Sequence, residues 1–256
     1  MDEIEPLQQP EGDPISVLKE FTAARIGIGR TGTSIPLKQS LAFKLAHAHA
    51  RDAVYSELDM DKLSDELQQF DLPVLQLHSQ AAYREQYLQR PDLGRQLSEE
   101  SISQLTDQPT KGIDIVIIIA DGLSATAVNS NAVALLKVLT PQLQAAGLKL
   151  APICLVKQGR VAIADDVGMY LNAKLSLILI GERPGLSSAD SMGAYLTFNP
   201  QPGLTDESRN CISNIRPHGL HFKPAAKKIF YLIQEAFKRK LSGVGLKDNA
   251  GLLSEP

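Results

Sequence analysis

The spacing of apolar residues changes near residue 110 of the chain. Before that point apolar side chains recur at helical intervals, and Leu41, Leu45, Ala48 and Ala53 form one stripe through residues 36–58. Helical spacing also extends through residues 15–24 and 61–70, while residues 72–78 are compatible with a short strand. The first hundred residues are therefore predicted to be mainly helical.

After residue 110 the pattern alternates between strands and helices. DIVIIIA (114–120), LKLAPICLV (148–156) and LSLILI (175–180) are continuous apolar runs, typical of strands buried on both faces. Helical segments at 124–147 and 161–173 separate them, the first capped by Ser124. This order predicts an α/β fold, a Rossmann-like and mainly parallel sheet with flanking helices. Ligands are then expected beyond the carboxyl ends of the strands.

The last third of the chain adds three elements to this prediction. MGAYLTF (192–198) is compatible with a further strand, and TDESRNCISN (205–214) is predicted to form a capped short helix. Residues 223–241 form an amphipathic helix with an apolar stripe. We divide the chain into a flexible acidic tail (1–20), a mainly helical region (21–110) and a Rossmann-like α/β domain (111–256).

Composition excludes several classes of protein. The net charge of −3 provides no basic field for a nucleic-acid backbone, and no apolar run is long enough to span a membrane. The two cysteines, Cys154 and Cys211, have no metal-ligand spacing, and we expect no metal site. Two cysteines are also too few for a disulfide framework, which favours a reducing, cytoplasmic compartment.

GIGRTG at 27–32 matches the dinucleotide-binding fingerprint, with Gly27, Gly29 and Gly32 in place and Asp52 at the distance of a ribose-binding acid. A genuine fingerprint follows a strand, whereas the residues before Gly27 have helical spacing. A stand-alone nucleotide-dependent α/β enzyme using Gly27–Gly32 is the alternative function that this motif leaves open.

Polar residues after the predicted strands are the other candidates. Glu182 follows the third apolar run in GERPGLSS, where Pro184 and Gly185 make a stiff turn that can aim its carboxylate. Asp121 follows the first run and has either a capping or a ligand-binding role. From the residues alone, Val161 is simply the first apolar residue of a helix, and Cys211 has no evident base beside it.

Several stretches together resemble the small subunits of ethanolamine ammonia-lyases. They are ARIGIGRTGTSIPLKQSLAFKLAHAHARDAV, DIVIIIADGLSATAV, QGRVAI, LIGERPGLSSADSMGAYL and GLTDESRNCISNIRPHGL, and they cover about residues 21 to 241 in order. The resemblance implies a subunit of an adenosylcobalamin-dependent lyase that converts ethanolamine into acetaldehyde and ammonia. It further implies that Val161, Glu182 and Cys211 contact the cofactor.

The same resemblance implies a division of labour between two chains. A large subunit binds the amino alcohol and hosts the radical chemistry, so this chain is expected to carry no catalytic residue and to work in a hetero-oligomer. No histidine lies in an Asp-x-His-x-x-Gly pattern, consistent with a family in which the cofactor's own benzimidazole is the lower cobalt ligand. Relatives of this lyase are packaged in bacterial microcompartments, but residues 1–13 form no obvious amphipathic signal.

A third hypothesis is a scaffold without a ligand, which would use the long helix predicted at 36–57 as an interaction surface.

Overall fold

The computed structural model describes residues 14–22, 24–108 and 111–247. The N-terminal segment contains η1 (Pro14–Glu20), α1 (Leu37–Val54), α2 (Met60–Leu67), η2 (Gln68–Phe70), β1 (Val74–His78), α3 (Arg84–Gln89), η3 (Leu93–Arg95) and α4 (Glu99–Thr106). The remainder contains β2 (Ile115–Ala120), α5 (Ala125–Ala145), β3 (Ile153–Lys157), α6 (Ile163–Tyr170), β4 (Leu175–Gly181), β5 (Met192–Phe198), η4 (Asp206–Ser208), β6 (Asn210–Ile215), α7 (Phe222–Arg239) and η5 (Gly243–Gly245).

The six strands form one mixed sheet in the order β1-β3-β2-β4-β5-β6. The first four strands of this order are parallel, whereas β5 and β6 are antiparallel to their neighbours. The α/β class is confirmed. The sheet is mixed, so the prediction of a mainly parallel sheet is correct only for those four strands, and its Rossmann-like character stays a prediction. Residues 182–191 link β4 to β5 and are too few for a crossover helix, so β5 returns antiparallel.

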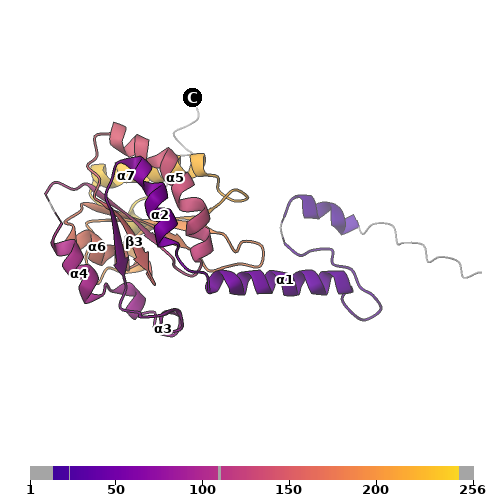
Figure 1. Ribbon diagram of the computed structural model, residues 1–256. Helices are drawn as coiled ribbons and strands as arrows, with labels where there is room; N and C mark the ends of the chain where they lie inside the picture. Colours follow the sequence, from indigo (N-terminus) through magenta and orange to yellow (C-terminus); the bar gives the residue numbers. More distant parts are fainter. Residues whose placement is uncertain (1–13, 23, 109–110, 248–256) are drawn as a thin grey trace, which may run out of the picture.

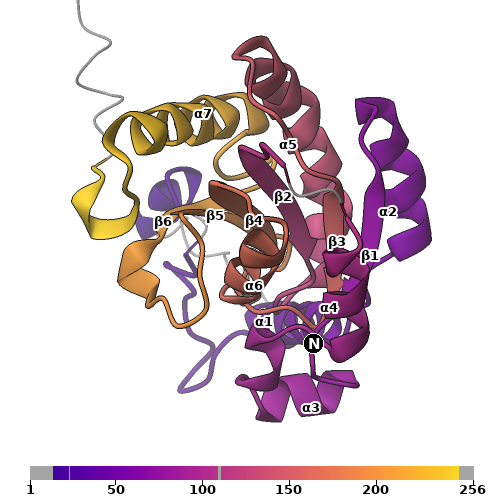
Figure 2. The same cartoon turned by 90° about the vertical axis from the view of Figure 1, so that its left-hand side faces the viewer.

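Helices cover both faces of the sheet (Figure 2). α2, α5 and α7 pack on one face, where Ile117, Leu155 and Leu177 belong to a continuous apolar core. α4 and α6 pack on the other face, against a second core that includes Ile118 and Ile178. β2, β3 and β4 thus contribute alternate residues to the two cores, which is why their runs are apolar throughout.

Three sequence predictions for the later strands and helices have clear outcomes. Ser124 caps α5, since its side chain accepts the backbone N–H of Ala127. The predicted strand at 192–198 is β5. The predicted helix at 205–214 is wrong, because only Asp206–Ser208 forms a 3₁₀ turn and the next residues form β6 on the sheet edge. Backbone pairing with β5 outweighs the local capping signal there.

η1 and most of α1 stand apart from the sheet and the helices that cover it (Figure 1). α1 extends away from the sheet and η1 lies to one side of its outer half, while Ala53, near its last residue, is the only buried residue of α1. Of the predicted tail at 1–20, residues 1–13 lie outside the described residues, and Pro14–Glu20 form a 3₁₀ helix. The division at residue 110 stays a prediction; β1, which comes before it, pairs with β3.

Candidate functional site

The open face of β5 and β6 forms the floor of the candidate site. Met192, Ala194 and Leu196 point into the core under α5 and α7, so Gly193, Tyr195 and Thr197 lie on the opposite face. On β6, Ile212 is buried in the same core, and the adjacent Cys211 and Ser213 are exposed. α6 covers the parallel strands but leaves part of this floor uncovered.

Glu182 lies across this floor directly after β4. Its carboxylate accepts the hydroxyl of Ser191 at 2.5 Å, the hydroxyl of Ser213, and the backbone N–H of Asn214 at 3.2 Å. Gly193 lies beneath it, and a Cβ there would come within 3.0 Å of Glu182 Oε1. The sequence did not predict this set of donors. Three of the roughly four acceptor positions of the carboxylate are in use, which leaves one on Oε1 for a ligand.

The turn after Glu182 is stiff, as its proline and glycine predict. Gly185 and Ser188 exchange backbone hydrogen bonds of 3.3 and 3.2 Å, and a Cβ at Gly185 would meet Ser188 Oγ at 2.6 Å. The backbone N–H of Glu182 also donates to Ser191 at 3.0 Å. Arg183 is exposed. These contacts hold the carboxylate in a fixed direction.

Cys211 is the cross-strand neighbour of Tyr195. Partial desolvation raises the pKa of the Cys211 thiol, and the charge of Glu182 adds to this, whereas a hydrogen bond with Tyr195 lowers it. Burial likewise raises the pKa of Tyr195, which stays a neutral phenol. Glu182 and Cys211 therefore belong to one cluster around Tyr195, although 28 other residues separate them in the sequence.

Val161 lies between β3 and α6 and is half-buried. It lines a hollow of about 720 Å³ whose walls also include Arg160, Tyr195 and Thr205. Tyr195 thus joins the hollow beside Val161 to the cluster of Glu182 and Cys211. Sequence reasoning missed Tyr195, although the alternation in MGAYLTF places it on the face opposite Met192 and Ala194.

Asp165, which lines the hollow, belongs to a buried ion pair. Arg209 makes two hydrogen bonds to Asp165, at 2.6 and 2.7 Å, and both side chains are 2% exposed. The guanidinium also donates to Thr197 Oγ1 and to the Leu204 carbonyl. This pair fixes the start of β6 against α6, and sequence reasoning missed it because the partners are far apart in the chain.

Asp121 has a structural position beneath the Val161 turn. Its carboxylate accepts the backbone N–H groups of Gln158 and Gly159, at 2.9 and 3.0 Å, and Arg84 lies 3.7 Å away. Burial raises the pKa of Asp121 to about 6, against the lowering effects of these hydrogen bonds and of Arg84. The residue is 2% exposed. Asp121 therefore orients the turn that leads to Val161.

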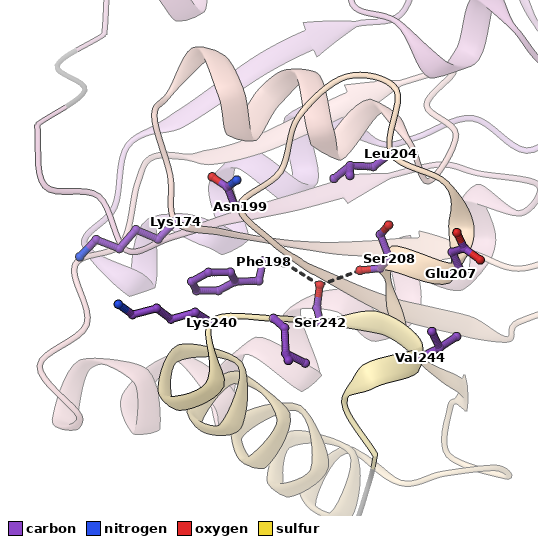
Figure 3. A pocket seen from close by; sticks show the side chains of 10 residues that line it. Lys174, Phe198, Asn199, Leu204, Glu207, Ser208, Lys240, Ser242 and Val244 are labelled. Atoms are coloured by element: carbon purple, nitrogen blue, oxygen red, sulfur yellow. Dashed lines mark hydrogen bonds between the residues drawn. The ribbon is translucent and has the colours of Figure 1, made fainter.

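A second hollow, of about 580 Å³, lies where β4 begins and β5 ends (Figure 3). Lys174, Phe198 and Lys240 line it, and Ser242 joins its walls by accepting the Phe198 N–H and donating to the Ser208 carbonyl. Val161, Glu182 and Cys211 do not line it, so we place the candidate site at the carboxyl ends of β3 and β4.

The dinucleotide-binding fingerprint does not lie at the end of a strand of the sheet. Gly27–Gly32 lies in the loop before α1, outside the sheet, and a 3₁₀ helix rather than a strand precedes it. The nucleotide-binding alternative is therefore not supported. In the described residues, no cluster of three or more His, Cys, Asp or Glu side chains could hold a metal ion. No helix in that part of the chain has the length and apolar character needed to cross a membrane.

Comparisons with known proteins agree on one family. The model of the family Ethanolamine ammonia-lyase light chain (EutC) matches residues 12–247. The ethanolamine ammonia-lyase small subunit of Pseudomonas fluorescens SBW25 is 52% identical over 93% of this chain and 87% of the relative. The small subunit of Azotobacter vinelandii DJ is 52% identical over 93% and 89%, respectively.

A third relative extends this match over nearly the whole chain. The ethanolamine ammonia-lyase small subunit of Pseudomonas syringae pv. tomato DC3000 is 49% identical over 98% of this chain and 88% of its own length. Such identity over almost the full length of both proteins cannot arise from a single shared motif. The chain therefore belongs to the ethanolamine ammonia-lyase light chain family.

Proposed function

We propose that this chain is the small subunit of an adenosylcobalamin-dependent ethanolamine ammonia-lyase and holds the cofactor against a large subunit. The enzyme converts ethanolamine into acetaldehyde and ammonia. The observation that carries the proposal is the cluster of Glu182, Tyr195 and Cys211 on the uncovered face of β5 and β6.

The residues present fit a large, flat and amide-rich macrocycle. Gly193 lets the Glu182 side chain lie flat over β5, and the free acceptor position on Oε1 can take an N–H from an amide of the cofactor. Cys211 and Val161 supply small contacts on either side of Tyr195. A flat site that is open on one side also requires a second protein to enclose the ligand.

When bound, adenosylcobalamin supplies the homolysis of its cobalt–carbon bond. The residues of this chain supply orientation. Glu182 is a fixed acceptor, Asp121 orients the turn that leads to Val161, and the ion pair of Arg209 and Asp165 holds β6 against α6. The chemistry on the substrate is then the task of the large subunit.

Co-purification of the chain with its large subunit tests this proposal. We expect the pair to retain cobalamin, detected by its visible absorption, and to deaminate ethanolamine, whereas this chain alone does neither. Glu182→Ala should weaken cofactor binding, because a lost charge-assisted hydrogen bond costs about 1.5–3 kcal/mol. Arg183→Ala, at the exposed neighbouring position, is the matched control.

Two results would overturn the proposal. One is a pair that binds no cobalamin, and the other is a cofactor dissociation constant that Glu182→Ala leaves unchanged. Because Glu182 also binds Ser191, Ser213 and Asn214, the melting temperature of each variant must be measured alongside. Packaging in a bacterial microcompartment is a further expectation for this family, and the N-terminal residues 1–13 lie outside the described part of the chain.

A further inference from the structure

The N-terminal arm, defined as residues 17–51, carries a surface that the body of the chain does not cover. Most of the large apolar side chains that are exposed in the described structure belong to it, and α1 projects from the body (Figure 1). They are Val17, Leu18, Phe21, Ile35, Leu37, Leu41, Phe43 and Leu45, all between 44% and 80% exposed. So many exposed apolar side chains on one segment indicate an interaction surface.

The apolar residues of α1 do not all lie on one side. At 100° per residue, Leu37, Leu41 and Leu45 share one side of the helix, whereas Phe43 is about 200° from Leu41. A helix that lies flat on a lipid surface has its apolar residues on a single face. This distribution therefore favours a protein groove that encloses α1 from more than one direction.

The arm is also basic, in contrast to the rest of the chain. Residues 17–51 contain Lys19, Arg25, Arg30, Lys38, Lys44 and Arg51 but only one acidic residue, Glu20, while the whole chain has a net charge of −3. The partner surface that suits this arm combines apolar pockets with acidic side chains.

The arm reaches the candidate site. Arg25 Nη2 donates to the carbonyl of Leu186 at 3.2 Å, and Leu186 belongs to the turn that follows Glu182. The Arg25 guanidinium also lies 5.7 Å from the ring centroid of Phe43 on α1. The exposed surface of the arm is therefore continuous with the loop beside the proposed cofactor face, and a protein that covers one can cover the other.

We propose that the N-terminal arm is the docking element for the large subunit, which receives α1 in a groove with apolar and acidic side chains. The inference rests on the proposed function only for the identity of the partner. Arg25 of the arm donates a hydrogen bond to the turn that contains Leu186. A partner that binds α1 would therefore lie next to Glu182.

Binding of the co-expressed large subunit to variants of this chain tests the proposal. Leu41→Glu combined with Leu45→Glu should weaken association by about tenfold or more, as expected for a central apolar contact. Lys38→Glu combined with Lys44→Glu should also weaken association, and the loss of affinity should be larger at low salt than at high salt. Val244→Glu is the matched control, because Val244 is 68% exposed but lines the second hollow and is not part of the arm.

The outcomes separate this proposal from the proposed function. Unchanged affinity in the leucine variant, with circular dichroism showing an intact fold, would refute the docking role of the arm while the wild-type pair still binds cobalamin. A wild-type pair that associates through the arm but binds no cobalamin would leave docking intact and refute the proposed function. The leucine variant could instead lose self-association of the chain, or lose binding to vesicles of anionic phospholipid, while its affinity for the large subunit stays unchanged. Either result would overturn docking to the large subunit in favour of a second copy or a lipid surface.

Discussion

Asp121 accepts the backbone N–H of Gln158 at 2.9 Å, which ties the end of β2 to the turn after β3. Gln158 has a positive φ of 56°, a conformation that a non-glycine residue adopts rarely. The hydrogen bond, and a second one from Gly159 at 3.0 Å, stabilise this unusual turn. The proposed contact residue Val161 comes two residues after Gly159, so Asp121 influences the site without touching it.

The stability of the chain should depend on pH through Asp121. Folding raises the pKa of this carboxyl from its ordinary 3.8 to about 6, mainly because it is buried. The stabilising contribution is therefore fully present below pH 3.8 and is lost as the pH rises through 6. The difference corresponds to about 3 kcal/mol.

Urea unfolding of the wild type and Asp121→Asn between pH 4 and 7 measures this contribution. The free energy of unfolding of the wild type should fall with rising pH relative to that of Asp121→Asn. Folding also raises the pKa of Asp165 and Asp166. The wild type and Asp121→Asn both contain these groups, so their effects cancel in the difference between the two proteins. A difference that stays constant across the range would contradict the prediction.

The ion pair of Arg209 and Asp165 should contribute strongly to folding. Asp165→Ala leaves a buried guanidinium without its carboxylate, which costs about 3–5 kcal/mol. The exposed pair of Arg90 and Asp92, with hydrogen bonds of 3.0 and 2.7 Å, is the matched control, and Asp92→Ala should change stability little. Urea unfolding midpoints measure the loss of stability in each variant. Equal losses would contradict a larger contribution from the buried pair.

Two glycines with positive φ should respond differently to the same substitution. Gly122 has a φ of 57°, and a Cβ there would meet the Gly181 carbonyl at 2.2 Å, whereas Gly147, with a φ of 74°, faces open space. Both substitutions to alanine cost about 1–2 kcal/mol for the backbone conformation. Gly122→Ala should lose several kcal/mol more from the clash, visible as a lower unfolding midpoint or a lower folded yield.

The sequence predicted the parallel half of the sheet well and the antiparallel half poorly. Continuous runs such as LSLILI can only be buried strands when helices alternate with them. The segment at 205–214 contains a capping signal and becomes a strand because β5 offers it an edge and because Arg209 is drawn to Asp165, contacts that involve distant parts of the chain. Periodicity within a segment carries no information about either.

The candidate site was predictable only residue by residue. The turn after Glu182 follows from Pro184 and Gly185, and a place at the end of β4 follows from the apolar run before it. The donors from Ser191 and Ser213, and the position of Tyr195 between Glu182 and Cys211, depend on the pairing of β5 with β6. Their register was not available from the sequence.

Thiol labelling should distinguish the two cysteines. Cys211 is exposed, whereas Cys154 is fully buried and its pKa is raised to about 12. Iodoacetamide should therefore modify only Cys211 in the folded chain and both thiols after unfolding, because the thiolate is the reactive form. Cys211→Ala should abolish labelling of the folded chain, and labelling that persists in this variant would show that Cys154 is accessible.

Two variants should shift the rate at Cys211 in opposite directions. The charge of Glu182 raises the pKa of this thiol, so Glu182→Gln should increase the thiolate fraction and speed up labelling at pH 8. The hydrogen bond with Tyr195 lowers the same pKa, so Tyr195→Phe should slow it. A general loosening of the strands would accelerate both variants. Opposite changes at unchanged melting temperature therefore require that the three side chains interact as one cluster, on which the proposed cofactor site depends.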